Sequence, residues 1–187
     1  VINALIEKLA LTDVQADTWS AVEWINDNNS YFVSSLDLGG FDSLTGVLDL
    51  TALSHLNKIS APYTNINELK LPDSVKNIGD GAFYGCEELM DVYLPESLQS
   101  IGDRAFADCS SLSNIALPLS LESIGSYAFM NCETLKSVYL PKSVSKIGAC
   151  AYSGCHGLIN VYFIGGIPSD IGSDIFAGCA EEVKIYS

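Results

Sequence analysis

A tandem repeat of fixed length governs most of this chain. Four copies begin with a Leu-Pro pair and start 23 residues apart, at Leu71, Leu94, Leu117 and Leu140. A looser copy occupies residues 163–187, and a degenerate first copy occupies residues 48–70. A period of this length is typical of a solenoid, in which each repeat forms one coil and buries its apolar face against the neighbouring coils.

The repeated positions within each copy are apolar or geometrically special. In the first full copy they are Leu71, Pro72, Val75, Ile78, Gly79, Ala82, Phe83, Cys86, Leu89 and Val92. The segment "DVYL", and its counterparts "NIAL", "SVYL" and "NVYF", alternate between apolar and variable residues as a strand does. Strands one coil apart are expected to pair in parallel, and the proline that follows ends each of them. Ile-Gly is expected to form a tight return turn, and the Phe to fill the centre of the coil.

The cysteines follow the same period. Five of the six occupy one repeated position, which we expect to point inward: Cys86, Cys109, Cys132, Cys155 and Cys179. A free cysteine in such a position behaves as a small buried hydrophobe. Neighbouring coils are within disulfide range, but side chains stacked in parallel have poor dihedral angles for bridging, so we expect reduced thiols. Cys150 lies at a variable position and is the candidate for a reactive thiol.

The N-terminal segment lies outside the repeat. Val14, Thr18, Val22 and Ile25 have helical spacing, and Asn28 begins a polar cluster that would stop a helix. Because the first coil of a solenoid needs a cover, we expect residues 1–47 to form a helical cap and an entry segment. Residues 48–187 would then form the solenoid, in coils 48–70, 71–93, 94–116, 117–139, 140–162 and 163–187.

The motif LPxSVxxIGxxAFxxCxxLxxVxL resembles the BspA-like (Treponema pallidum type) leucine-rich repeat. The resemblance is strong over residues 71–187 and weak over residues 48–70, with departures at Tyr152, Ile175 and Glu182. It implies an α/β fold: a right-handed leucine-rich-repeat solenoid of about six coils with a parallel, concave β-sheet, behind the N-terminal helical cap. Such proteins are typically bacterial and secreted or at the cell surface, and several are implicated in adhesion. The resemblance therefore implies an extracellular or cell-surface protein.

Composition excludes several classes of function. The net charge is −14, from 23 acidic and 9 basic residues. This balance argues against nucleic acid and against an anionic membrane surface, both of which need clustered Lys and Arg. No apolar run approaches the roughly 20 residues that cross a bilayer, so membrane insertion is not expected. The sequence begins at Val1 rather than Met, and we expect the natural N-terminus to have been trimmed.

The sequence carries no catalytic or metal-binding motif. The two histidines, His55 and His156, are not part of a CxxC or HxxxH pair, and His156 follows a cysteine in a repeated apolar position. No P-loop, GxSxG or HExxH pattern occurs. We therefore expect a protein that is not an enzyme and that holds no metal and no cofactor.

The variable positions of the strands are the candidate binding surface. The predicted binding residues are Lys70, Asp91, Tyr93, Asn114, Tyr139, Asn160, Tyr162 and Tyr186. A column of tyrosines beside polar side chains is typical of rigid recognition surfaces for a protein or glycan ligand. Tyrosines stacked along a sheet also stabilise it. The alternative is therefore a structural spacer of a larger surface protein, with no ligand of its own. The identity of a ligand and the oligomeric state do not follow from the sequence.

Overall fold

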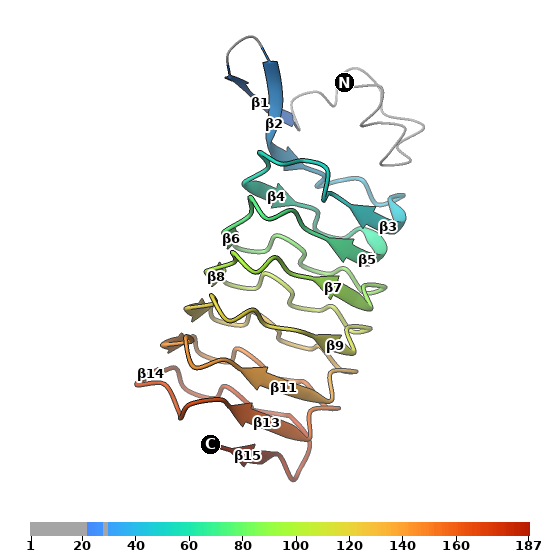
Figure 1. Cartoon of the computed structure of the whole chain (residues 1–187). Coiled ribbons are helices and arrows are strands. Elements are labelled where there is room, and N and C mark those ends of the chain that lie inside the picture. Colours follow the sequence, from blue (N-terminus) through green and yellow to red (C-terminus); the bar gives the residue numbers. More distant parts are fainter. Residues whose placement is uncertain (1–21, 28–29) are drawn as a thin grey trace.

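The chain is a stack of flattened coils that runs from the N-terminal to the C-terminal end (Figure 1). The computed structural model describes residues 22–27 and 30–187. Each coil contributes one short strand to each of two sides of the stack, and a continuous apolar core lies between them. The two columns of strands are visible in Figure 1, with β3 to β15 along one side and β4 to β14 along the other.

The first column contains the strands that the repeat predicts. They are β3 (Thr45–Asp49), β5 (Asn65–Lys70), β7 (Asp91–Tyr93), β9 (Asn114–Ile115), β11 (Ser137–Leu140), β13 (Asn160–Phe163) and β15 (Lys184–Tyr186). They form a four-stranded sheet, β3-β5-β7-β9, and a three-stranded sheet, β11-β13-β15. Pairing is parallel at the repeat spacing, as in Val92 opposite Ile115. The parallel-sheet solenoid is thereby confirmed.

The solenoid has about seven turns rather than six. Strand β3 pairs in parallel with β5, which is the strand of the first predicted coil, and so adds a turn before that coil. The sequence did not show this turn because only Val47 to Leu50 carry its alternation, without Leu-Pro, Ile-Gly or cysteine. The right-handed sense and the concave curvature stay predictions.

A second column of strands lies where the sequence predicted only a return turn. It comprises β4 (Lys58–Ser60), β6 (Asn77–Ile78), β8 (Ser100–Ile101), β10 (Ser123–Ile124), β12 (Lys146–Ile147) and β14 (Asp170–Ile171). The last five form one parallel sheet. Each of these five strands is two residues long, so it shows one variable and one apolar residue and no alternation that could be recognised. The prediction of a single parallel sheet was therefore incomplete.

The predicted helical cap is wrong over the residues that can be compared. Val22–Asp27 form strand β1, antiparallel to β2 (Ser30–Asp37), and β2 in turn pairs in parallel with β4. No helix occurs within residues 22–27 and 30–187. Val22 and Ile25 are β-branched, and a paired partner strand favours the extended conformation over the helical spacing. Val14 and Thr18 lie outside the described residues.

An aromatic stack runs through the centre of the solenoid. Phe83, Phe106, Phe129 and Tyr152 are fully buried. Their rings stack from coil to coil, with centroids 5.3, 5.5 and 5.1 Å apart. The prediction that the Phe position fills the coil is confirmed. Tyr152 brings a hydroxyl into this stack, and that hydroxyl has no hydrogen-bond partner.

The repeated cysteines form a hydrogen-bonded column. From Cys109 onward each thiol donates to the carbonyl oxygen of the aromatic residue one coil earlier, as Cys109 does to Phe83 at 3.3 Å and Cys132 to Phe106 at 3.3 Å. Cys86, the first of the column, donates to the carbonyl oxygen of Ala61 at 3.2 Å. Burial raises the pKa of the Cys109 and Cys132 thiols. In the coil before Cys86 the position holds Thr64, whose hydroxyl donates to the Ala61 carbonyl at 3.0 Å. The position therefore selects a small side chain with one proton to donate, rather than an apolar side chain alone.

The glycine after each repeated isoleucine is required by close packing between coils. A Cβ at Gly125 would lie 2.6 Å from the backbone nitrogen of Asp103, and one at Gly148 would lie 2.3 Å from that of Ser126. These glycines do not have a left-handed φ, so the expectation of an unusual backbone is wrong at this position. Gly79 starts the series, and nothing lies within 4 Å of a Cβ built there.

Left-handed backbone occurs at two other positions of each coil. One holds Gly81, Arg104, Tyr127, Cys150 and Asp174, and the other holds Tyr63, Gly85, Asp108, Asn131, Gly154 and Gly178. Gly, Asn and Asp are the residues that tolerate this conformation best, which explains the second series apart from Tyr63. Cys150 is thus placed by a turn, and it is half-buried rather than fully exposed.

Gly125→Ala is expected to destabilise the protein by about 1–3 kcal/mol, because the added methyl group overlaps the backbone of the preceding coil. Gly79→Ala is the matched control, since the same change there meets open space. Urea denaturation of both variants measures the difference. Equal midpoints for the two variants would contradict the close-packing argument.

Tyr152→Phe is expected to stabilise the protein by about 1 kcal/mol, because it removes a buried hydroxyl that has no partner and leaves the ring in place. The control is Tyr139→Phe, whose ring is 57% exposed and whose hydroxyl can bond to water. Thermal and urea melts compare the two. A lower stability of Tyr152→Phe would mean that the hydroxyl is bonded after all.

The thiol column is expected to resist alkylation while the protein is folded, because thiolate is the reactive form and burial raises the pKa of these thiols. Cys150 should be labelled first, and all six cysteines should be labelled in denaturant. Mass spectrometry of iodoacetamide-treated protein locates the label. Two or more disulfides within the column would refute free thiols.

Candidate functional site

Three stacked tyrosines form the most regular feature of the β3–β15 side. Tyr139, Tyr162 and Tyr186 occupy equivalent positions of β11, β13 and β15, in register with one another. Ring centroids are 4.5 Å apart between Tyr139 and Tyr162, at an interplanar angle of 4°. Between Tyr162 and Tyr186 they are 4.6 Å apart, at 12°. The rings thus form a ladder with the spacing of the strands, and we call it the tyrosine ladder.

The tyrosine ladder is open to solvent along its length. Tyr139 is 57% exposed and Tyr186 is 43% exposed, whereas Tyr162 lies between two rings and is half-buried. Partial desolvation and the flanking hydroxyls of Tyr139 and Tyr186 raise the pKa of Tyr162. Tyr162 is therefore neutral at physiological pH, and the ladder offers flat aromatic edges and three hydroxyl groups to a ligand.

The other predicted residues of this column lie apart from the ladder. Lys70 and Tyr93 are register partners on β5 and β7, and the Lys70 ammonium lies 5.4 Å from the Tyr93 ring centroid. The same ammonium forms an ion pair with Glu68 at 2.7 Å. Ala116, which is exposed, stands between this pair and the tyrosine ladder. Ala116 thus divides the predicted column into two parts, the Lys70–Tyr93 pair and the tyrosine ladder.

The predicted polar column lies beside the tyrosines. Asp91 and Asn114 are register partners and both are exposed. Asn160 is half-buried, and its side-chain amide donates to the Ser137 hydroxyl at 3.5 Å. These groups leave donors and acceptors free for a ligand that lies across the strands.

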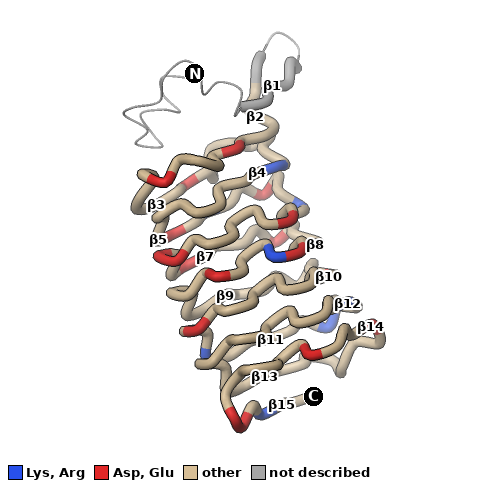
Figure 2. The backbone as a smooth tube through the Cα atoms, turned by 180° about the vertical axis from the view of Figure 1, so that it is seen from behind, with Lys and Arg blue, Asp and Glu red and all other residues tan. Residues whose placement is uncertain are grey.

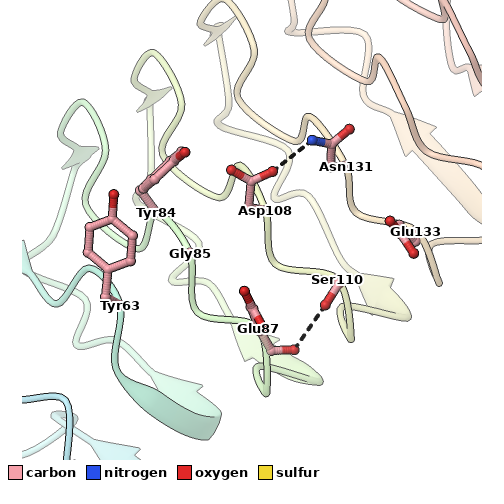
Figure 3. A pocket seen from close by; sticks show the side chains of 8 residues that line it. All are labelled: Tyr63, Tyr84, Gly85, Glu87, Asp108, Ser110, Asn131 and Glu133. Carbon is pink, nitrogen blue, oxygen red and sulfur yellow. Dashed lines mark hydrogen bonds between the residues drawn. The ribbon is translucent and has the colours of Figure 1, made fainter.

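A groove on another part of the surface was not predicted. It has a volume of about 460 Å³ and crosses four successive coils at the left-handed turns before the cysteines. Figure 3 shows two tyrosine rings at one end and carboxylates along the rest. The residues that define it are Tyr63, Tyr84, Glu87, Asp108, Asn131 and Glu133. We call it the turn groove.

The geometry of the turn groove follows from its turns. Tyr63 and Tyr84 meet edge to face, with ring centroids 5.2 Å apart at 82°. The Tyr63 ring lies against Gly85, where an added Cβ would come within 2.7 Å of it. Asp108 accepts a hydrogen bond from the Asn131 amide at 2.7 Å. Hydrogen bonding to Asp108 also raises the pKa of Tyr84.

Sequence reasoning missed this groove because each coil supplies only one or two of its residues. Glu87 and Asp108 occupy variable positions, which by themselves indicate only a solvated face. The available signal was Tyr63, a bulky residue at the position where later coils carry Gly, Asp or Asn.

The described residues carry no arrangement for metal or nucleophilic chemistry. No group of three or more His, Cys, Asp or Glu among them could hold a metal ion. His156 is exposed while Cys155 is buried, so the two do not act together. In this part of the chain there is also no helix of the length and apolarity that a membrane span requires.

Comparison with solved structures finds bacterial leucine-rich repeat proteins. One from Bacteroides ovatus is 27% identical, with a TM-score of 0.66; the match covers 92% of this chain and 46% of that one. The T. pallidum leucine-rich repeat protein is 25% identical, with a TM-score of 0.66 and 91% of each chain covered. The pneumococcal vaccine antigen PcpA is 25% identical, with a TM-score of 0.57, over 92% of this chain and 38% of that one. The chain thus spans about half or less of the Bacteroides and pneumococcal proteins.

Comparison of the sequence alone identifies the family. No curated protein matches it significantly. A family model, the BspA type leucine rich repeat region, matches residues 55–182 in six copies. Since this match extends over more than half of the sequence, the chain belongs to the BspA-type leucine-rich repeat family.

Proposed function

We propose that this chain is a non-catalytic binding module that recognises a protein or glycan through its β3–β15 side, with the tyrosine ladder as the main contact. The observation that carries the proposal is the stacking of three tyrosines at 4.5 and 4.6 Å on one sheet, with the outer two exposed and the middle one half-buried. Rings held in this way lose little conformational entropy when a ligand binds, because their rotamers are already fixed.

The chemistry of the face favours a polar ligand. The tyrosine hydroxyls and the side chains of Asp91 and Asn114 offer hydrogen bonds, and the ring faces and edges offer apolar contact. Recognition of sugar rings and of polar protein surfaces requires both hydrogen bonds and apolar contact. An apolar small molecule would need an enclosed pocket instead.

The competing function is a spacer that holds another domain away from a surface. In a spacer the tyrosine ladder would only stabilise the sheet through cross-strand contacts. Stacking explains the regular spacing of the rings but does not require their exposure. Tyr93 lies outside the ladder and is also exposed, although no stacking requires a tyrosine there, and this supports the binding function.

The proposed location is the cell surface or the extracellular space, with adhesion as the biological role. The resemblance to bacterial leucine-rich repeat proteins supports this location, and so does the likeness to a pneumococcal protein described as a vaccine antigen. A matrix protein, a host-cell glycan or another microbial surface would then be the partner.

The double variant Tyr139→Ser/Tyr162→Ser is expected to weaken binding of a partner by at least about tenfold, equivalent to about 1.4 kcal/mol, because it removes two of the stacked rings. Partners are first sought among immobilised matrix proteins and a glycan array, and affinity is then measured by surface plasmon resonance.

The matched control is Leu119→Ser/Ile167→Ser, which removes two exposed apolar side chains away from the tyrosine ladder. Both double variants must retain the melting transition of the parent protein. If the ladder variant binds as tightly as the control, the rings are architectural and the spacer function replaces this proposal.

A further inference from the structure

We propose that the turn groove is a second binding site, which takes a lysine- or arginine-bearing peptide segment of a protein partner. The proposal does not rest on the tyrosine ladder, because the residues of the groove come from the turns on either side of the repeated cysteine position and not from the strands. Three features of the groove carry the inference: its aromatic corner, its unbalanced charge and its elongated shape.

The aromatic corner suits a cationic side chain. Tyr63 is 60% exposed, so its ring is open to a ligand, and Tyr84 stands at 82° to it. A cation that settles in this corner meets the face of one ring and the edge region of the other. Attraction between a cation and a tyrosine face strengthens when a ligand displaces water from it.

The charge of the groove is negative and is not balanced locally. Glu87, Asp108 and Glu133 line it, and no Lys or Arg does. Within residues 22–27 and 30–187 the one ion pair joins Lys70 to Glu68, on the strand side. The positive charge of Arg104 partly offsets the rise in the pKa of Tyr84, but the Arg104 guanidinium itself lies over the Tyr127 ring, 4.8 Å from the ring centroid.

The acidic surface extends beyond the groove. Figure 2 shows acidic residues recurring along the coils, with Lys and Arg few and scattered. A basic partner is therefore attracted at long range, which raises its association rate before any specific contact forms.

The shape of the groove favours a peptide over a single ion or a small amine. It crosses four coils, and strands of successive coils lie about 4.8 Å apart. The aromatic corner is at one end, Asp108 is near the middle and Glu133 is at the other end (Figure 3). An extended segment can place one basic side chain in the corner and another beside Glu133.

A neutral glycan is the weaker candidate for this groove. Sugars do stack on tyrosine, but a neutral sugar leaves three carboxylates to be desolvated without a compensating charge, which is costly. Asp108 already accepts a hydrogen bond from Asn131, so part of its capacity for sugar hydroxyls is used.

The test uses the acetylated and amidated peptide Lys-Gly-Lys-Gly-Lys, with a fluorescent label, as the probe. Binding is measured by fluorescence anisotropy at about 0.15 M ionic strength, where distant charges are screened within about 8 Å. Glu87→Gln/Glu133→Gln is expected to weaken binding about tenfold. The matched control is Asp73→Asn/Glu96→Gln, which removes the same charge from two exposed carboxylates outside the groove.

A second variant tests the aromatic corner without disturbing the turn. Tyr63→Asn removes the ring and keeps a residue that tolerates the left-handed backbone, as Asn131 does at the equivalent position. This variant should weaken binding of the probe peptide while the protein stays folded. It should leave the binding of any partner of the tyrosine ladder unchanged.

Three results would overturn the proposal. Equal weakening by the groove variant and by its charge control would mean diffuse attraction to an acidic protein. Absence of probe binding to the parent protein would exclude a basic-peptide site. Binding of a neutral oligosaccharide such as maltohexaose, lost in Tyr63→Asn, would assign the groove to glycans instead.

Discussion

The close approach of each coil to the one before it is the constraint on which the structure depends. At Gly102, Gly125, Gly148 and Gly172 a Cβ would lie within 2.8 Å of backbone atoms of the preceding coil. With that contact made, the coils align in register in both columns of strands, the aromatic rings stack at 5.1 to 5.5 Å, and each thiol reaches a carbonyl oxygen of its neighbour. Glycine, aromatic residue and cysteine thus recur together because each of them makes an equivalent contact with the preceding coil.

The same constraint arranges the functional surfaces. Side chains at one variable position are held at the spacing of the strands, so tyrosines on three consecutive coils must either stack or turn away. They stack, at 4.5 and 4.6 Å, and the ladder is rigid because the sheet beneath it is rigid. In the turn groove the residues before the cysteines are fixed by the left-handed backbone, which leaves their side chains little freedom to vary in direction. Recognition on this scaffold therefore depends on which residues occupy fixed positions, more than on loop conformation.

Most of the fold was predictable because the repeat shows it several times. Val92, Ile115, Val138 and Val161 recur at one position and are all buried, as the alternation of the strands required. The predictions that failed concern segments that either do not repeat or are too short to show a pattern. Strands such as β8, Ser100–Ile101, are too short to show a pattern, and β1 is specified by pairing with β2 rather than by its own periodicity. Helical spacing in one short segment could not reveal a partner strand that only the folded chain supplies.

The two candidate sites differ in how much of each could be predicted from the sequence. The tyrosine ladder has one residue type at one position of consecutive coils, so its alignment and the interruption at Ala116 followed from the period, and only the geometry of the rings required the structure. The turn groove draws on three positions of the repeat and on four coils, so no single column of the repeat contains it. Its chemistry arises where a tyrosine of an early, degenerate coil lies against a glycine of the next coil. Departures from a repeat, which add nothing to the fold, are thus the places where a solenoid of this kind acquires an individual binding surface.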